Sequence, residues 1–323
     1  MTERTERDDT PGTPALRESR MHLLTPAAPG VGVVVSNERC TASRKSTGFV
    51  RHLALDVSAT PLARAWVSGQ SFGVLPPGLD PQGRPHRLRL YSIASPTAGE
   101  DGAGNIIATT VKRTIDEHVE TGKLFLGVAS NYLCDLQPGE QVRLTGPNGK
   151  RFVLPTDPAQ HDYVFIATGT GIAPFRGMIR ELLETGVRSR VVLVMGVPYA
   201  ADLLYDAELR ALAQAHPNFT YLTALSREPQ PDGAPPMYVH ARLAHAAELF
   251  APLLASERTL LYMCGIAGME LGVLQTLART LPPGTLEQYL RADAPVLAEI
   301  DRWERRHLHK DVRPTRRVFM EVY

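Results

Sequence analysis

Three residues of one short stretch, Arg89, Tyr91 and Ser92, have the chemistry to bind a phosphorylated ring compound. An arginine can pair with phosphate, a tyrosine ring can stack on a flat ring system, and a serine hydroxyl can hydrogen-bond to a ring nitrogen. Residues 87–95 alternate polar and apolar side chains at close to a period of two, which predicts a β-strand with a core face and a ligand face. An ordinary barrel strand with solvated arginines has the same pattern, so both interpretations stay open at this stage.

A second candidate site is the glycine-rich turn at residues 168–174, which follows an apolar run and precedes a helical one. Glycines let the backbone approach a pyrophosphate, and the amino end of a helix supplies N–H donors with a partial positive charge. Many such turns are only tight connections, so the strand and helix on either side are what favour a dinucleotide site. That site would include Thr170 and Gly171.

Two regions of different rhythm must position these stretches. Between residues 47 and 154 short β-like runs alternate with turns, which predicts an antiparallel barrel or sandwich. After residue 155 apolar strands alternate with helices, which predicts a doubly wound parallel sheet with ligands beyond the carboxyl ends of its strands. We expect a mobile extension at 1–45, with a short edge strand possible at 33–35, a barrel at 46–156 and an α/β domain at 157–323.

Composition narrows the classes of function. The chain has 323 residues, enough for two cores, and its 35 Lys and Arg nearly balance its 34 Asp and Glu. The formal charge of +1 gives no global argument for a nucleic-acid or membrane partner. No apolar run is long enough to span a bilayer and residues 1–20 resemble neither a signal nor a transit peptide, so we expect a cytoplasmic protein. Three scattered cysteines predict no disulfide framework, no internal iron–sulfur cluster and no bound metal.

A series of short segments, in a fixed order, resembles the plant-type ferredoxin–NADP(+) reductases. The segments are 69–75, 84–95, 111–113, 127–136, 145–147, 169–176, 226–228, 237–238, 262–265 and 321–323. The resemblance implies an FAD-binding antiparallel β-barrel followed by an NADP-binding parallel-sheet domain. It also implies an enzyme that exchanges hydride between flavin and NADP(H), and single electrons with a separate iron–sulfur protein such as ferredoxin.

The resemblance assigns roles to individual residues. Arg89 would contact the FAD pyrophosphate, Tyr91 the flavin ring, and Ser92 the flavin nitrogen that exchanges hydride. Further FAD contacts would come from Lys112, Val128, Ala129 and Ser130; the serine could instead, or also, cap a helix. The NADP site would comprise Thr170, Gly171 and Gly265 near the nicotinamide, and Ser226, Arg227 and Tyr238 around the 2′-phosphate.

Three residues late in the chain complete the implied catalytic set with Ser92. Cys264, which alone would more often be a buried small hydrophobe, would shape the nicotinamide site by its position rather than as a nucleophile, because hydride transfer needs no covalent intermediate. Glu321, otherwise a solvated carboxylate, would support the polar groups around Ser92. Tyr323 would lie flat on the flavin in the place of the nicotinamide until it is displaced.

The sequence departs from the family pattern in three places. Thr114 stands where a tyrosine usually stacks on the FAD adenine, so His118 or Phe125 could substitute, or the adenine is held loosely. His240 replaces a common glutamine, and would either reinforce the 2′-phosphate as a cation or be a neutral surface residue. Residues 281–317 form an enlarged basic segment.

The basic segment has two interpretations. Its cations are Arg302, Arg305, Arg306, Lys310, Arg313, Arg316 and Arg317. Such a run is usually a solvated helix face, but its place before the flavin-covering tail suggests a docking surface for an acidic iron–sulfur carrier. Two rival functions also stay open, namely an NADPH-oxidising component that supplies an oxygenase through a carrier, and a non-catalytic nucleotide-binding regulator.

Overall fold

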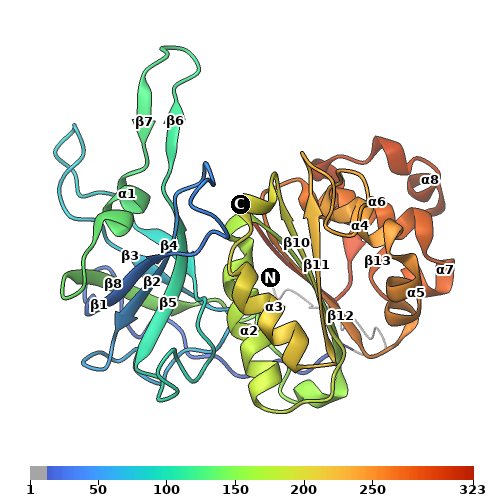
Figure 1. The fold of residues 1–323 in the computed structure, drawn as a ribbon, viewed down its shortest axis with the longest axis horizontal. Helices are drawn as coiled ribbons and strands as arrows, with labels where there is room; N and C mark the ends of the chain where they lie inside the picture. Colours follow the sequence, from blue (N-terminus) through green and yellow to red (C-terminus); the bar gives the residue numbers. More distant parts are fainter. Residues whose placement is uncertain (1–12) are drawn as a thin grey trace, which may run out of the picture.

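The computed structural model describes residues 13–323, which form two domains side by side along the long axis of the molecule (Figure 1). The first domain is β-structure with one long projecting hairpin. The second is a parallel sheet with helices on both faces. Both kinds of sheet predicted from the sequence are confirmed.

The first domain is built on a six-stranded antiparallel sheet with the strand order β4-β3-β8-β1-β2-β5. Its strands are β1 (Gly30–Arg39), β2 (Val50–Asp56), β3 (Ser71–Val74), β4 (Arg89–Ser92), β5 (Ile106–Lys112) and β8 (Gln141–Asn148). The two edges meet, because Ile93 just after β4 bridges to Thr109 of β5. The sheet therefore closes into a barrel, and helix α1 (Val128–Asp135) covers part of it by adding Leu133 and Cys134 to its core.

A separate hairpin, β6 (Ile115–Glu117) and β7 (Leu124–Leu126), extends away from the barrel between β5 and α1 (Figure 1). Its strands pair with each other, with Asp116 opposite Phe125. Several of its apolar side chains are exposed, which is unusual for a monomer surface and marks a place where a ligand or partner can bind.

The prediction of a mobile extension at residues 1–45 is wrong for the residues that form β1. This strand lies inside the sheet, between β8 and β2, and is hydrogen-bonded on both sides. Upstream of it, Leu16 bridges to Pro155 and Leu24 to Gly146, so the segment before β1 also packs on the domain. The valine and glycine run that forms β1 is flanked by charged and proline-rich residues, which mask its β-pattern. The rest of the prediction, at residues 1–12, lies outside the described residues.

The second domain contains five parallel strands in the order β11-β10-β9-β12-β15. They are β9 (Asp162–Thr168), β10 (Val191–Val197), β11 (Phe219–Leu225), β12 (Thr259–Gly265) and β15 (Val318–Val322). Alternate residues of β9 and β10 belong to two different core clusters, one on each face. Because both faces are covered, these strands are apolar along their whole length.

Helices pack on each face of this sheet. On the face toward the barrel lie α2 (Ile172–Glu184) and α3 (Asp206–Ala215), and on the other lie α4 (Val239–His245), α5 (Ala247–Ala255) and α6 (Met269–Thr280). Short 3-10 helices are η1 (Pro158–Gln160), η2 (Gly169–Gly171), η3 (Ala200–Asp202), η4 (Ile300–Arg302) and η5 (Arg305–His307).

The strand order reverses direction at β9, so the loops after β9 and β12 meet where ligands bind in such folds.

The segment 281–317 connects α6 to β15 through short elements. These are α7 (Pro283–Leu286), β13 (Leu290–Arg291), α8 (Ala294–Leu297), η4, η5 and β14 (Arg313–Pro314). In Figure 1, α7 and α8 lie at the end of the molecule opposite to the barrel.

Helix α2 joins the two domains. Arg176 of α2 donates to the Ala94 carbonyl at 3.1 Å, to Glu100 at 2.6 Å and to Glu208 at 2.8 Å, and it is only 7% exposed. A Cβ atom on Gly177 would lie 2.4 Å from the Ser95 carbonyl, so the helix backbone rests directly on the barrel. The helix that begins at the glycine-rich turn is thus fixed to the residues that follow β4.

Candidate active site

Two backbone turns meet at the carboxyl ends of β9 and β12. A Cβ atom on Gly171 would lie 2.0 Å from the Cys264 carbonyl oxygen, and one on Gly265, whose φ is +146°, would lie 2.1 Å from Thr168 Oγ1. Neither position can hold a larger residue without displacing the other turn. The two predicted glycines therefore make a close backbone contact that forms the floor of the candidate nicotinamide site.

The last strand brings the other predicted residues to this floor. In the parallel pair β12–β15, Cys264 lies opposite Glu321. The Tyr323 N–H donates to the Gly265 carbonyl at 3.0 Å, and the Ala267 N–H donates to the Tyr323 carbonyl at 2.9 Å. Tyr323 Oη and Thr170 Oγ1 are 2.6 Å apart. Residues that are 153 positions apart in the sequence thus share one hydrogen bond.

Cys264 and Tyr323 differ in exposure in a way that suits their predicted roles. The Cys264 side chain is fully buried, and burial raises the pKa of its thiol, so the sulfur stays protonated and is a poor nucleophile. Tyr323 is 64% exposed although its backbone is held at both ends of the residue. Its ring can therefore contact a bound ring system.

Glu321 lies opposite Cys264 in this strand pair, and burial raises its pKa to about 7. Near neutral pH it exists in both protonation states. A carboxyl with this property can both hold and release a proton under ordinary conditions, as a group near a site of proton exchange must.

The contribution of Glu321 to the free energy of unfolding should fall as the pH rises from about 5 to 8. The unfolded chain loses this proton near the ordinary pKa of 4.5, but the folded protein keeps it until about pH 7, so the fold gains stability at the acid end of that interval. We expect the free energy of unfolding of Glu321→Gln to change by about 1–3 kcal/mol less than that of the wild type between pH 5 and pH 8. Urea unfolding at pH 5, 6, 7 and 8 would measure the difference.

A second buried group titrates in the opposite sense and must be separated from this effect. Burial lowers the pKa of His52 to about 4, which makes the protein more stable as the pH rises from 4 to 6.5. Because His52 is present in both proteins, its contribution cancels in the difference between wild type and variant. Parallel curves for the two proteins would contradict the assignment to Glu321.

The predicted FAD strand faces this floor from the barrel. On β4, Arg89 is exposed, while Tyr91 and Ser92 are half-buried. Burial raises the pKa of Tyr91 to about 12, so its phenol is neutral and its ring packs against the barrel core. The Thr109 hydroxyl donates to the Ser92 carbonyl at 2.8 Å and holds the strand end in place. Together with the contact of η2 with β5, this places β4 and the nicotinamide floor on the two sides of one interface.

The predicted phosphate loop lies at the start of α1. Ser130 is buried, and its hydroxyl accepts from the Thr114 N–H at 3.1 Å and donates to the Gly127 carbonyl at 3.2 Å. This hydroxyl is therefore a local anchor. No side chain of residues 13–323 caps this helix, so the N–H groups of Val128 and Ala129 are better phosphate donors. Lys112 is exposed at the end of β5 nearby.

The hairpin β6–β7 stands where the resemblance places the FAD adenine. Phe125 is 54% exposed on β7, flanked by exposed leucines on the same strand. His118 lies at the turn, where its N–H donates to the Lys123 carbonyl at 2.8 Å. Of the two candidate substitutes for the missing tyrosine, Phe125 is the one that offers a flat apolar face from a strand.

The residues predicted around the 2′-phosphate are neighbours. Ser226 and Arg227 follow β11, and Tyr238 precedes α4; the Met237 N–H donates to the carbonyl of the last β11 residue at 2.8 Å and so draws the two segments together. Arg227 and Tyr238 are exposed, as anion-binding side chains must be.

The conformation of the loop between these residues is held by Gln230, which was not predicted as a site residue from the sequence. Gln230 is buried, and its amide both accepts from the Leu225 N–H at 2.9 Å and donates to the Leu225 carbonyl at 2.8 Å. A glutamine in a polar loop carries no local signal of this role.

His240 is better described as a neutral residue than as a phosphate-binding cation. Its ring stacks on Tyr238 with centroids 5.9 Å apart. Burial, and then the nearby charge of Arg279, lower its pKa, so it is uncharged at pH 7. It supports the tyrosine ring instead.

One member of the basic segment is not a surface residue. Arg317 is fully buried, and its guanidinium donates to the Thr259 carbonyl at 2.8 Å, to the Ser256 carbonyl at 3.0 Å and to Gln288 at 2.9 Å. The prediction that Arg317 belongs to a docking surface is therefore wrong. Unlike an exposed arginine, it holds the start of β12 against the segment 281–317.

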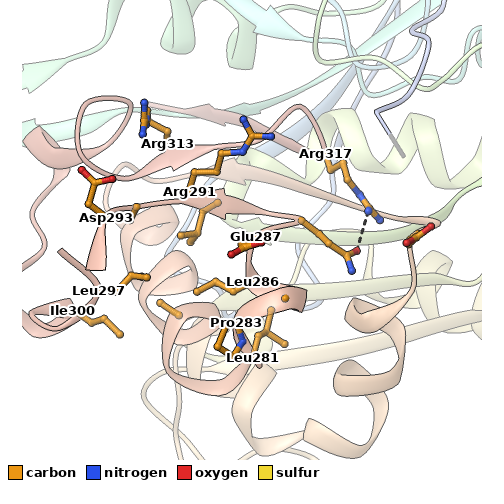
Figure 2. Close-up of a pocket in the computed structure, with 16 residues that line it drawn as sticks. Leu281, Pro283, Leu286, Glu287, Arg291, Asp293, Leu297, Ile300, Arg313 and Arg317 are labelled. Carbon is orange, nitrogen blue, oxygen red and sulfur yellow. Dashed lines mark hydrogen bonds between the residues drawn. The ribbon is translucent and has the colours of Figure 1, made fainter. Parts of the chain in front are cut away.

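A cavity of about 660 Å³ belongs to this segment, and Figure 2 draws the side chains that line it. Its walls combine apolar side chains such as Leu286, Leu297 and Ile300 with charged ones of both signs, including Asp293 and Arg313. The residues assigned to FAD and NADP lie elsewhere, at the other end of the parallel sheet's strands and on the barrel.

The residues present fit the two nucleotides that the resemblance implies. An exposed arginine, a half-buried tyrosine and an uncapped helix start suit FAD, while a backbone floor and an exposed arginine beside a tyrosine suit NADP. Within residues 13–323, no three His, Cys, Asp or Glu side chains group in a way that could hold a metal ion, and no helix is long and apolar enough to cross a membrane.

Comparison with known proteins identifies relatives along most of the chain. Residues 165–275 match the family described as the oxidoreductase NAD-binding domain. A ferredoxin–NADP reductase of Thermosynechococcus vestitus is 39% identical over 260 residues, which are 78% of this chain and 66% of the relative. A ferredoxin–NADP reductase of a Spirulina species is 38% identical over 259 residues, or 78% of this chain and 87% of the relative.

A plant relative and a solved structure extend this result. The chloroplastic leaf isozyme 1 of Arabidopsis thaliana ferredoxin–NADP reductase is 34% identical over 282 residues, 83% of this chain and 77% of the relative. A Plasmodium falciparum ferredoxin–NADP+ reductase structure superposes with a TM-score of 0.69 at 22% identity, covering 93% of this chain and 98% of that one. At this identity the likeness supports the fold alone.

Proposed function

This chain belongs to the ferredoxin–NADP reductase family, and on that premise we propose which of its residues carry the reaction. The reaction exchanges hydride between FAD and NADP(H), and single electrons between FAD and ferredoxin. One observation carries the assignment of the site: Thr170, Cys264, Glu321 and Tyr323 meet beyond the carboxyl ends of the parallel strands, opposite β4.

The barrel residues bind and orient the flavin nucleotide. FAD, when bound, links the two-electron chemistry of NADP(H) to the one-electron chemistry of ferredoxin. Arg89 and the first N–H groups of α1 neutralise its pyrophosphate, while Tyr91 packs against its ring. Ser92 offers a hydroxyl that can donate or accept a hydrogen bond at the reacting ring nitrogen. Lys112 adds positive charge at the phosphate side.

The adenine end is supported by the hairpin. The exposed ring of Phe125 takes the stacking role of the tyrosine that is missing at Thr114, because it lies on β7, between β5 and α1, the elements that supply the phosphate contacts. Its apolar neighbours on the hairpin exclude water from one side of the adenine.

The α/β domain positions NADP(H). Arg227, with Ser226 and Tyr238, binds the 2′-phosphate and so favours NADP(H) over NAD(H). The contact between Gly171 and Gly265 gives the nicotinamide a flat backbone floor, and Cys264 packs behind it. Glu321 holds a proton on its carboxyl below about pH 7 and can exchange it with groups around Ser92.

Tyr323 occupies the place of the nicotinamide between turnovers. Its exposed ring and its hydrogen bond to Thr170 support this role. A nucleotide must displace the ring, so only one that is also anchored through its 2′-phosphate competes well. The same ring helps to expel the product.

A visible spectrum recorded during anaerobic titration tests the function directly. The purified protein should be yellow, lose flavin absorbance on addition of NADPH, and recover it on addition of oxidised ferredoxin. A colourless protein that binds NADPH without turnover would instead indicate a regulator. A faster reaction with an oxygenase-linked carrier than with ferredoxin would leave the flavin and NADPH chemistry intact and would assign that carrier as the partner.

Ferredoxin is the partner of this family, and we place its docking surface on a smaller area than the basic segment as a whole. Residues Arg305 and His309 line a cavity of about 270 Å³ together with Glu321. Their neighbours Arg306 and Lys310 are exposed. By contrast, Arg313 lies on β14 and lines the 660 Å³ cavity of the same segment. Cytoplasmic location, like this surface, stays a prediction.

Reversing the charges at Arg306 and Lys310 should slow the ferredoxin-dependent reaction about tenfold at low ionic strength, because docking of an acidic protein is steered by such charges. Stopped-flow rates measured between 20 and 500 mM salt, roughly spanning strong to weak screening, should converge at the high end. Ferricyanide reduction by NADPH should be unaffected. Arg313→Glu reverses one charge beside the other cavity of the segment, and an effect of that variant as large as that of the double reversal would contradict the placement.

A further inference from the structure

The turn that follows β12 is fixed at several points. The Ile266 N–H donates to Thr168 Oγ1 at 2.9 Å, and Gly265 and Ala267 hold the backbone of Tyr323 between them. A further anchor is Glu270 in the first turn of α6, whose carboxylate accepts a hydrogen bond from the Gly268 N–H at 2.7 Å. The shape of this turn therefore determines where Tyr323 lies.

Glu270 is an unusual anchor because it is a buried carboxylate. Its side chain is only 2% exposed. A buried charge is costly unless a partner of opposite charge compensates for it. One Glu270 oxygen faces the Gly268 N–H, and the other accepts from Arg305 Nε at 2.9 Å.

Arg305 comes from η5 in the segment 281–317, which the family resemblance implies is enlarged. Its guanidinium reaches 35 positions back along the chain to Glu270. The side chain is 56% exposed, so it neutralises the buried carboxylate from the solvent side. The segment 281–317 is thus connected to the turn that holds Tyr323 through the Arg305–Glu270 ion pair.

We propose that Arg305 is a positioning residue for the nicotinamide site, acting through Glu270 on the turn 265–268 and hence on Tyr323. The expected change in nucleotide selectivity rests on the proposed function, whereas the structural role of Arg305 does not. Without the arginine, Glu270 would be left buried beside a single N–H donor, and would turn toward water. Gly268 would lose its anchor, and the backbone hydrogen bonds of Tyr323 would open more often.

Hydrogen–deuterium exchange of the full-length protein, with whatever flavin it carries, tests the structural step. Arg305→Ala should speed exchange in peptides that contain residues 265–268 and Tyr323 by about tenfold, which corresponds to about 1.4 kcal/mol. Arg305→Lys should keep most of the protection, because the positive charge remains. Exchange in the central strands should not change.

Two matched variants make the test specific. Arg302→Ala removes the same charge from an ion pair of the same length, 2.9 Å, but its partner Glu299 is 57% exposed. That variant should leave exchange in the turn unchanged. In a Glu270→Gln background there is no buried charge to neutralise, so Arg305→Ala should then have little further effect. Equal exchange in Arg305→Ala and wild type, or equal effects of Arg302→Ala, would overturn the proposal.

The kinetic consequence is a change in nucleotide selectivity. A looser turn lets the nicotinamide displace Tyr323 more easily, so the ratio of kcat/KM for NADPH to that for NADH should fall about three- to tenfold in Arg305→Ala. A change confined to KM for both nucleotides would contradict positioning of Tyr323. If the wild-type protein lacks flavin or NADPH turnover, the proposed function fails, whereas the exchange experiment still decides the role of Arg305.

Discussion

Arg176→Ala is expected to lower the free energy of unfolding by about 3–5 kcal/mol. The arginine is buried between the domains, where it pairs with Glu100 at 2.6 Å and Glu208 at 2.8 Å and lies 5.0 Å from the centre of the Tyr205 ring. Its removal leaves two carboxylates short of a partner in a poorly solvated place. Guanidinium unfolding, followed by circular dichroism, measures the loss.

Two variants separate the buried pair from general damage to α2. Arg180→Ala removes a more exposed arginine that also contacts Glu100, at 2.9 Å, and should cost no more than about 1 kcal/mol. Adding Glu100→Gln to Arg176→Ala should recover part of the loss, since the carboxylate that lost its shorter ion pair is then uncharged. A loss below 1 kcal/mol for Arg176→Ala would show that the network does not hold the domains together.

Tyr323→Ser should tighten nicotinamide binding and reduce the preference for NADPH over NADH by about tenfold or more. The ring contributes about 0.5–1.5 kcal/mol of stacking beyond its burial, and the variant removes both. NADH gains most, because it has no 2′-phosphate with which to compete against the ring. Steady-state kinetics with both nucleotides, and the charge-transfer absorbance on adding NADP+, measure the two effects.

Tyr323→Phe is the control for this prediction. It keeps the ring but removes the hydroxyl that lies 2.6 Å from Thr170 Oγ1. The preference for NADPH over NADH should change by less than about threefold, because one exposed hydrogen bond contributes little free energy. Unchanged selectivity and an unchanged charge-transfer spectrum in Tyr323→Ser would show that the ring does not occupy the nicotinamide place.

The sequence was sufficient where local pattern and chemistry agree. The apolar runs of β9 and β12 and the glycine-rich turn predicted the parallel sheet and its ligand edge, because strands covered on both faces must be apolar throughout. The strand β4 was recognised from its alternation. Ser226, Arg227 and Tyr238 needed the family resemblance, since a polar loop followed by a tyrosine carries no signal of its own.

Interactions between distant residues could not be predicted in the same way. The strand β1 was predicted only as a possible short edge strand at 33–35, because its full length and its place inside the sheet depend on two neighbouring strands rather than on its own residues. Arg317 was assigned to the surface because arginine is rarely buried, yet three carbonyl groups surround it. Glu270 and Arg176 act through partners far away in the sequence, at Arg305 and Glu100, and no spacing rule reveals such pairs.

The way α2 is attached has a consequence for motion. The helix starts at the nicotinamide floor and is locked to the barrel by Arg176 and by the backbone contact at Gly177. A hinge between the domains would have to break buried ion pairs at every turnover, which is far slower than the movement of one exposed side chain. We therefore expect the nucleotide to enter by displacement of the Tyr323 ring alone, while the two domains keep a fixed separation.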